Sequence, residues 1–211
     1  MLAAGLAVLV INYMLKYGGA KGPEPIACGK FLPLCFFLFL LFMSQIIVAC
    51  GGRDLIISDR ECALSMLSVV PGCDVHLLIH GNAKGADAAI AGAAYQLGWP
   101  CIGISADWLK HGKAAGPIRN GQLLQLAIEK AEILQIEALA KAKAKYAWAV
   151  SPVAISVHSL AQITVIAFPG GKGTADLVRQ AQKLCNRSPV PIVIRHISAP
   201  RVHALSPALA K

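Results

Sequence analysis

Residues 44–52 read SQIIVACGG, a short apolar run rich in β-branched residues that ends on a pair of glycines. A run of this length and composition predicts a strand that is buried in a sheet. A glycine turn directly after a buried strand is how doubly wound α/β domains begin, because glycine permits a tight turn and a close approach of the backbone to a ligand. The stretch therefore predicts an α/β domain with its first strand at Ser44–Cys50.

Short apolar strands and helical stretches alternate through the rest of the chain. Ser58 and Glu61 have the spacing of a capping box, and Gly98 closes an alanine-rich helical stretch. The alternation implies right-handed βαβ units, and it predicts a Rossmann-like three-layer α/β domain with a mainly parallel sheet. Further strands are expected at 75–79, 100–104, 163–168 and 190–194, and helices at 58–70, 85–97, 114–149 and 174–184.

The first 50 residues carry only four charged side chains, and residues 31–50 carry none. Two interpretations compete here. Either 31–50 is a transmembrane helix, or an apolar leader over 1–42 precedes the first strand of the domain. The glycine turn favours the second interpretation. The leader itself is then either a membrane anchor or an extension upstream of an authentic start at Met43. We expect a cytoplasmic protein, or a membrane-anchored one if the leader is retained.

Composition excludes several classes of protein. With 56% hydrophobic and 15% charged residues, the chain is neither disordered nor collagen-like. Its formal net charge is +9, and the basic residues gather in the C-terminal half. No aromatic-basic repeat accompanies them, so a pocket for small anionic ligands is favoured over nucleic acid.

The cysteines and histidines indicate no metal centre. The seven cysteines form no CxxC pair, which is typical of buried thiols in a reducing compartment. His76 and His80 have HxxxH spacing, but on a strand four residues span about 13 Å, too far to share one ion. We therefore expect neither a metal nor a cofactor.

Four clusters rich in glycine and polar residues follow predicted strands. In a parallel sheet the carboxyl ends of the strands share one edge, where ligands bind, so the clusters are expected to converge. The last cluster, PGGKGT, precedes a helix whose free N–H groups and positive dipole end suit a phosphate. It has neither the Walker nor the GxGxxG spacing. The clusters are Gly51–Asp54, His80–Asp87, Asp107–Asn120 and Pro169–Thr174.

These motifs, GGRD (51–54), HGNAKGAD (80–87), SADWLKHGKAAGPIRN (105–120) and AFPGGKGT (167–174), occur in an order that resembles the YspA-like branch of the SLOG superfamily. The DprA and Lonely-guy proteins are relatives of this branch. The resemblance covers about Ser44–Ile197, and it implies a modified Rossmann fold with a pocket for a nucleotide or a nucleotide-derived ligand such as a relative of ADP-ribose. The leading function that it implies is that of a sensor or carrier domain.

The roles expected within the motifs are those of phosphate and nucleoside recognition. The glycines of PGGKGT and its threonine would bind a phosphate, and Arg119 would clamp a second anionic oxygen. Asp54 and Asp87 would accept ribose hydroxyls, although capping a helix is the alternative for Asp87. Trp108 would stack on a base or pack against the protein. Candidate ligand-binding residues are Gly51, Gly52, Arg53, Asp54, His80, Gly81, Gly85, Asp87, Asp107, Trp108, Lys113, Gly116, Asn120, Pro169, Gly170, Gly171, Lys172, Gly173 and Thr174.

The resemblance also implies a second function. Lonely-guy proteins are phosphoribohydrolases that use an arginine and the glutamate ending PGGxGTxxE. Here Leu177 stands at the position of that glutamate and Asp176 stands one place earlier, so the catalytic candidates are Arg119 and Asp176. A third function is DprA-like binding of single-stranded DNA, and the net positive charge is the only feature that supports it.

One segment departs from the family pattern. The connection between the third and fourth motifs is longer than in YspA-like chains, with an excess at about 128–161. It predicts a lengthened helix or a hairpin that binds a partner, and it leaves the position of Arg119 relative to PGGKGT open.

The expected domain runs over 43–197 with a tail over 198–211, and we expect homo-oligomers formed through its helices.

Overall fold

The structure is a computed structural model, and it describes residues 44–70, 74–145 and 161–198. The predicted leader, residues 146–160 of the predicted excess and nearly all of the predicted tail lie outside the described residues.

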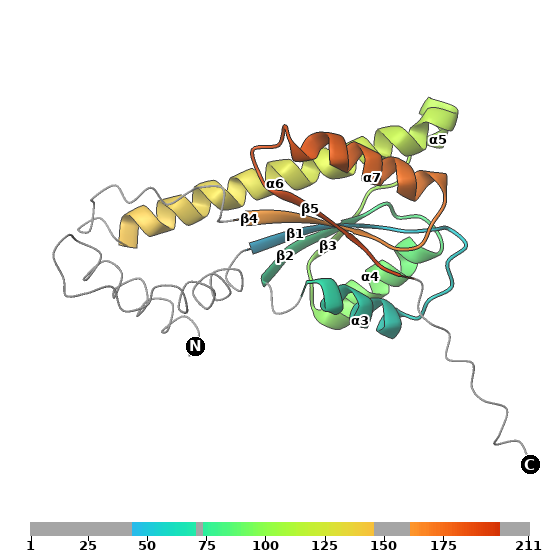
Figure 1. Cartoon of the computed structure of the whole chain (residues 1–211), viewed down its shortest axis with the longest axis horizontal. Helices are drawn as coiled ribbons and strands as arrows, with labels where there is room; N and C mark the ends of the chain where they lie inside the picture. Colours follow the sequence, from blue (N-terminus) through green and yellow to red (C-terminus); the bar gives the residue numbers. More distant parts are fainter. Residues whose placement is uncertain (1–43, 71–73, 146–160, 199–211) are drawn as a thin grey trace, which may run out of the picture. The chain divides into compact units, whose positions relative to one another are not determined.

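Five strands form one parallel sheet in the order β3-β2-β1-β4-β5 (Figure 1). β1 and β4 pair in register from Ser44 opposite Ala161 to Cys50 opposite Ala167. Because the chain leaves β1 for β2 on one side and reaches β4 on the other, the order reverses between β1 and β4, which is where such folds bind ligands. The strands are β1 (Ser44–Cys50), β2 (Asp74–His80), β3 (Cys101–Gly103), β4 (Ala161–Ala167) and β5 (Ile192–His196).

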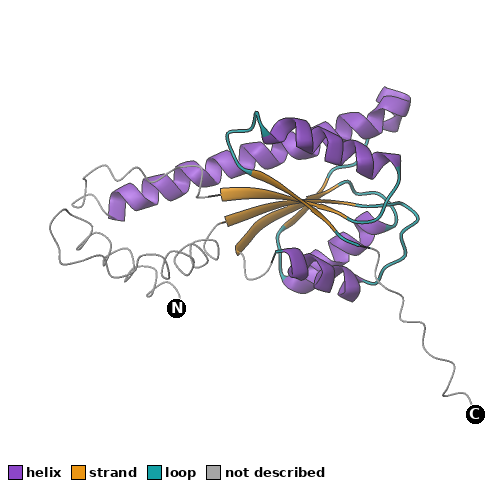
Figure 2. Cartoon of the chain, in the orientation of Figure 1, coloured by secondary structure: helices purple, strands orange, loops and turns teal. Residues whose placement is uncertain are grey.

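Helices cover both faces of the sheet, which makes the Rossmann-like three-layer fold (Figure 2). α6 and α7 pack together over β1, β4 and β5, and α3 and α4 pack together on the opposite face. The helices are α3 (Asp59–Val69), α4 (Ala86–Leu97), α5 (Trp108–His111), α6 (Ala115–Lys145) and α7 (Lys172–Cys185), with a 3-10 turn η1 at Gly112–Ala114.

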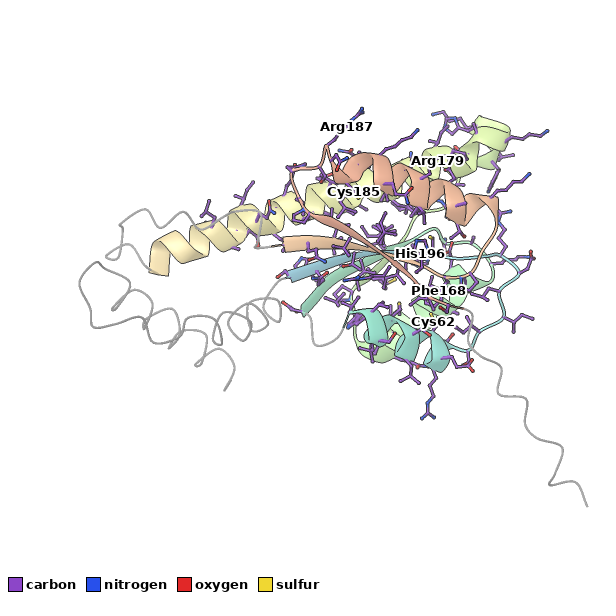
Figure 3. All side chains as sticks on the ribbon, in the orientation of Figure 1. Cys62, Phe168, Arg179, Cys185, Arg187 and His196 are labelled. Carbon is purple, nitrogen blue, oxygen red and sulfur yellow. The ribbon has the colours of Figure 1, made fainter. Side chains whose placement is uncertain are left out.

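The core explains why the strands read as continuous apolar runs. Ile46 and Val48 of β1 pack with Leu123 and Leu124 of α6, while Ile47 on the other side of the strand is also fully buried. Both faces of the central strands are therefore buried from solvent, as in other parallel sheets covered by helices. Phe168, which directly follows β4 (Figure 3), is 2% exposed.

Most predicted boundaries agree with the structure to within two residues. The Ser58–Glu61 capping box forms, and Gly98 ends α4 in the left-handed conformation. The last strand begins two positions later than predicted, at Ile192, because Pro191 has no N–H to donate and only its carbonyl accepts from Ile163 N.

The described part of the predicted excess continues α6 to Lys145, as the lengthened-helix alternative requires.

Within the three described ranges, no helix combines the length and the apolar character that crossing a bilayer requires.

Candidate functional site

A pocket of about 1030 Å³ opens at the carboxyl edge of the sheet, where β1 and β4 end. Its walls come from the loops after β1, β2 and β4, from Trp108 of α5, and from the first turns of α6 and α7. The strand order reverses at this place, so the pocket occupies the position in which Rossmann-like folds bind ligands.

The glycine loops after β1 and β4 pack against each other beneath the pocket. Gly52 N donates to Pro169 O at 2.9 Å. A Cβ on Gly170 would collide with the Thr174 hydroxyl and would lie 2.7 Å from Gly52 N, so only glycine fits there. The two loops that border the switch point therefore form one continuous backbone surface.

The start of α7 presents backbone donors to the pocket. Ala175 N is the first N–H of this helix bonded to a helical carbonyl, that of Gly171, so the N–H groups before it lack such acceptors. Thr174 is only 9% exposed, and its hydroxyl has no hydrogen-bond partner among the described residues. This end of the helix can therefore bind an anion through its backbone, its dipole and a hydroxyl.

Asn120 and Asp176 hold the glycine loop of β4 against α6. Asn120 is 2% exposed, and its Nδ2 donates to Gly173 O at 3.1 Å and to Asp176 Oδ2 at 3.0 Å. Asp176 also accepts from Gln180 Nε2 at 2.8 Å and from Arg179, which lies on α7 (Figure 3). Burial raises the pKa of the Asp176 carboxyl, but these hydrogen bonds outweigh it and hold that pKa below its ordinary value. Asp176 is thus an ionised carboxylate whose two oxygens are already occupied.

Arg119 lies at the floor of the pocket rather than free within it. Its Nη1 donates to Gly81 O and lies 3.7 Å from Asp87 Oδ2, while its Nε is buried without a partner among the described residues. Burial lowers the pKa of Arg119, and burial raises the pKa of Asp87 although Ala83 N and Arg119 oppose the rise. Desolvation therefore outweighs the mutual attraction of this pair.

Asp87 lines the pocket but does not cap its helix. The N-cap of α4 is Gly85, without a side-chain cap, and Asp87 accepts instead from Ala83 N at 3.1 Å. Arg119 Nη1 approaches the same oxygen, Oδ2, so the carboxylate ties the loop after β2 to α6.

Cys50 and His80 complete a buried polar group below the pocket. Burial, helped by the charge of Asp87, raises the pKa of the Cys50 thiol to about 12. Burial also lowers the pKa of His80, whose Nδ1 accepts from Asn82 N at 3.1 Å. Both groups are neutral near pH 7, so neither supplies a thiolate nucleophile or a cation to the pocket.

Arg53 lies over the ring of Trp108. The Arg53 guanidinium carbon lies 5.0 Å from the centroid of the indole ring, and both side chains line the pocket. Trp108 is 49% exposed, so it is not a packed core residue.

Three predicted ligand-binding residues do not line the pocket. His80 is buried at the end of β2. Gly85 has a φ of +75°, and a Cβ there would collide with the carbonyl of Arg53. This glycine therefore lets the loop after β2 pack closely against the loop after β1. Asp107 caps the short helix α5 by accepting from Lys110 N at 3.0 Å. The predicted residues that do line the pocket are Gly51, Gly52, Arg53, Asp54, Gly81, Asp87, Trp108, Lys113, Gly116, Arg119, Asn120, Pro169–Thr174 and Asp176.

Sequence reasoning missed other lining residues. Arg179 lies two helical positions beyond Leu177, past the end of the glycine motif, and the i,i+3 spacing from Asp176 was the signal available for it. Cys50 and Leu123 belong to the apolar core pattern, which carries no sign of a site. The complete additional set is Cys50, Leu55, Ala83, Pro117, Leu123, Ala175, Leu177 and Arg179.

In the described part of the chain, no three His, Cys, Asp or Glu side chains lie close enough together to hold a metal ion. The pocket is lined by five cationic side chains and three carboxylates, and the cations Arg53, Lys113 and Lys172 make no ion pair with any described residue. Cationic side chains therefore outnumber carboxylates in the lining of the pocket.

A scan of the sequence against protein-family models finds no match, and a search of curated proteins finds none either.

Proposed function

We propose that this protein binds a nucleotide or a nucleotide-derived ligand, as a sensor or carrier of the YspA-like branch of the SLOG superfamily, and that the loop Pro169–Thr174 holds its phosphate. The observation that carries the proposal is the unpartnered hydroxyl of Thr174 at the start of α7, at the point where the strand order reverses. A buried hydroxyl without a partner costs about 1–3 kcal/mol, and a phosphate oxygen would remove that cost.

Two further features support a phosphate at this loop. Arg119 Nε is a second buried donor without an acceptor among the described residues. Lys172, on the first turn of α7, and Lys113, across the pocket at η1, supply positive charge that no described carboxylate neutralises. Missing acceptors and excess positive charge in one pocket both favour an anionic ligand.

A nucleoside fits the remaining groups. Asp54 lines the pocket and makes no ion pair with any described residue, so its carboxylate can accept from the hydroxyls of a ribose. The pocket of about 1030 Å³ is large enough for a nucleotide, since small-molecule sites run from roughly 300 to 1,000 Å³.

Hydrolysis of a nucleotide is not favoured by the same geometry. A general acid or a nucleophile needs a carboxylate that can reach the substrate, and the oxygens of Asp176 are bonded to Asn120, Gln180 and Arg179. Leu177, at the position of the family's glutamate, is 1% exposed and has no proton to transfer.

The test is calorimetric titration of the full chain with AMP and with adenosine, which lacks the phosphate. We expect AMP to bind at least about tenfold more tightly, and Thr174→Val to weaken AMP binding by about ten- to a hundredfold, because a hydrogen bond to a charged group is lost. Lys172→Gln should also weaken binding of AMP. Lys183→Gln, on the last turn of the same helix and outside the pocket, is the matched control.

Equal affinity for AMP and adenosine, or an unchanged affinity in Thr174→Val, would exclude a phosphate at this loop. Proton NMR of the same mixtures reports on chemistry. Release of adenine and ribose 5-phosphate would replace the sensor proposal with a phosphoribohydrolase.

A further inference from the structure

Trp108 contributes a half-exposed aromatic ring to the lining of the pocket. Its side chain is 49% exposed, whereas a tryptophan that serves only the core is mostly buried. Asp107 caps the helix that carries it, and a Cβ on Gly116 would lie 3.6 Å from Cη2 of the indole, so the ring is held beside the first turn of α6. The ring is thus positioned by the protein and remains half-exposed.

Arg53 is the only cation recorded over an aromatic ring in the described residues, and it lies over this one. The distance of 5.0 Å from the guanidinium carbon to the ring centroid leaves no space for another group between them. A flat ring in that gap would need two van der Waals contacts of about 3.5–4 Å each. Any aromatic group that uses this face of the indole must therefore replace Arg53.

Such a replacement is energetically easy. Arg53 is exposed, and a cation–π contact between exposed groups is weak. Stacking between an aromatic side chain and a nucleic-acid base is stronger, and it does not depend on which base is present, because every base has a π face. The guanidinium released from the ring would remain beside the pocket as a free cation.

The placement of Trp108 relative to the anion-binding loop sets the kind of ligand. The indole comes from α5, before α6, whereas Thr174 and Lys172 come from α7, so the two features are separate parts of one pocket wall. A ligand that uses both carries a phosphate at one end and a flat aromatic group at the other.

We infer that Trp108 is the stacking platform for the base of the ligand, and that Arg53 covers the ring only while the site is empty. This inference rests on the proposed function, since it assigns the end of the ligand that the loop Pro169–Thr174 does not hold. It restricts the ligand to phosphates that carry a base. Sugar phosphates without a base are expected to bind more weakly.

The test compares AMP with ribose 5-phosphate, which shares the phosphate and the ribose but has no base. Dissociation constants are measured by calorimetry on the full chain for wild type, Trp108→Leu and Trp108→Phe. Trp99→Leu is the matched control, because Trp99 is half-buried and does not line the pocket. Since Trp108 is half-exposed, neither change at this position removes core packing.

We expect wild type to bind AMP more tightly than ribose 5-phosphate. Trp108→Leu should weaken AMP binding by about ten- to a hundredfold and leave ribose 5-phosphate unchanged. Trp108→Phe, which keeps an aromatic face, should fall between, and Trp99→Leu should match wild type.

Equal affinity of wild type for the two compounds, or an equal loss for both in Trp108→Leu, would overturn the stacking role and leave the phosphate site intact. Failure of wild type to bind either compound would overturn the proposed function and this inference together.

Discussion

Asn120 Nδ2 lies 3.0 Å from Asp176 Oδ2, and the same amide nitrogen lies 3.1 Å from Gly173 O. One buried side chain of α6 thus fixes both a carboxylate and a carbonyl in the first turns of α7. The position of the loop Pro169–Thr174 relative to α6 depends on this amide.

Asn120→Ala removes both hydrogen bonds, so Gly173 O loses its side-chain donor and Asp176 Oδ2 keeps only that of Gln180. We expect a loss of about 1–3 kcal/mol in the free energy of unfolding, measured by urea denaturation. Without the Asn120 donor, the pKa of Asp176 should also rise toward its ordinary value, which NMR titration of the carboxyl would detect. An unchanged unfolding free energy would mean that the amide is not needed to hold α7.

Gly170→Ala should destabilise the protein, and Gly173→Ala should not. A Cβ at position 170 meets the Thr174 hydroxyl and Gly52 N, so the two glycine loops must separate, whereas a Cβ at position 173 meets nothing within 4 Å. Overpacking costs about 1–3 kcal/mol, while alanine within a helix is favoured over glycine by up to about 1 kcal/mol. Thermal unfolding of the two variants should therefore shift in opposite directions, and equal shifts would contradict the contact between the loops.

His80 should make the stability fall as the pH is lowered below about 6.5. Burial lowers the pKa of His80 in the native state. Between that native pKa and the ordinary value of 6.5, the unfolded chain binds the proton and the native chain does not. The free energy of unfolding therefore decreases as the pH falls through this interval. Above pH 6.5 His80 does not affect it. In His80→Asn this contribution disappears, and urea midpoints at pH 7.5 and pH 5.5 should differ less than in wild type. A variant with the full wild-type pH dependence would contradict the assignment.

Thiol labelling should separate the described cysteines by burial. Cys101 is exposed, whereas Cys50 is 8% exposed and has a pKa of about 12 against an ordinary 9.0. Its thiolate fraction near pH 8 is therefore about a thousandfold below that of an unperturbed thiol. In native protein iodoacetamide should modify Cys101 and spare Cys50, and both should react in urea, as peptide mass spectrometry would show. Labelling of native Cys50 at the rate of Cys101 would mean that the pocket floor opens.

Local signals in the sequence were sufficient for the elements of the fold. The buried strand Ser44–Cys50, the capping box at Ser58 and the glycine end of α4 at Gly98 each depend on residues a few positions apart, and each forms as predicted. The order of the motifs was also sufficient to gather most of their residues at one edge, since parallel strands carry their carboxyl ends to the same side.

The partners of the charged side chains were decided only by the tertiary structure. Arg119 and Gly81 are 38 positions apart, and Asn120 and Gly173 are 53 positions apart, so no local pattern relates them. For the same reason no local pattern relates Arg53 to the Trp108 ring over which it lies.

Sequence alone determined that this chain builds a parallel α/β sheet with glycine-rich loops at one edge, because hydrophobic period, capping and turn preferences are local properties of the chain. The tertiary structure decided which charges are neutralised and which remain free. It ties Arg119 to Asp87 and Asp176 to α6, and it leaves Thr174, Lys113 and Lys172 without protein partners among the described residues. Desolvation and pairing depend on neighbours that only the packed fold brings together.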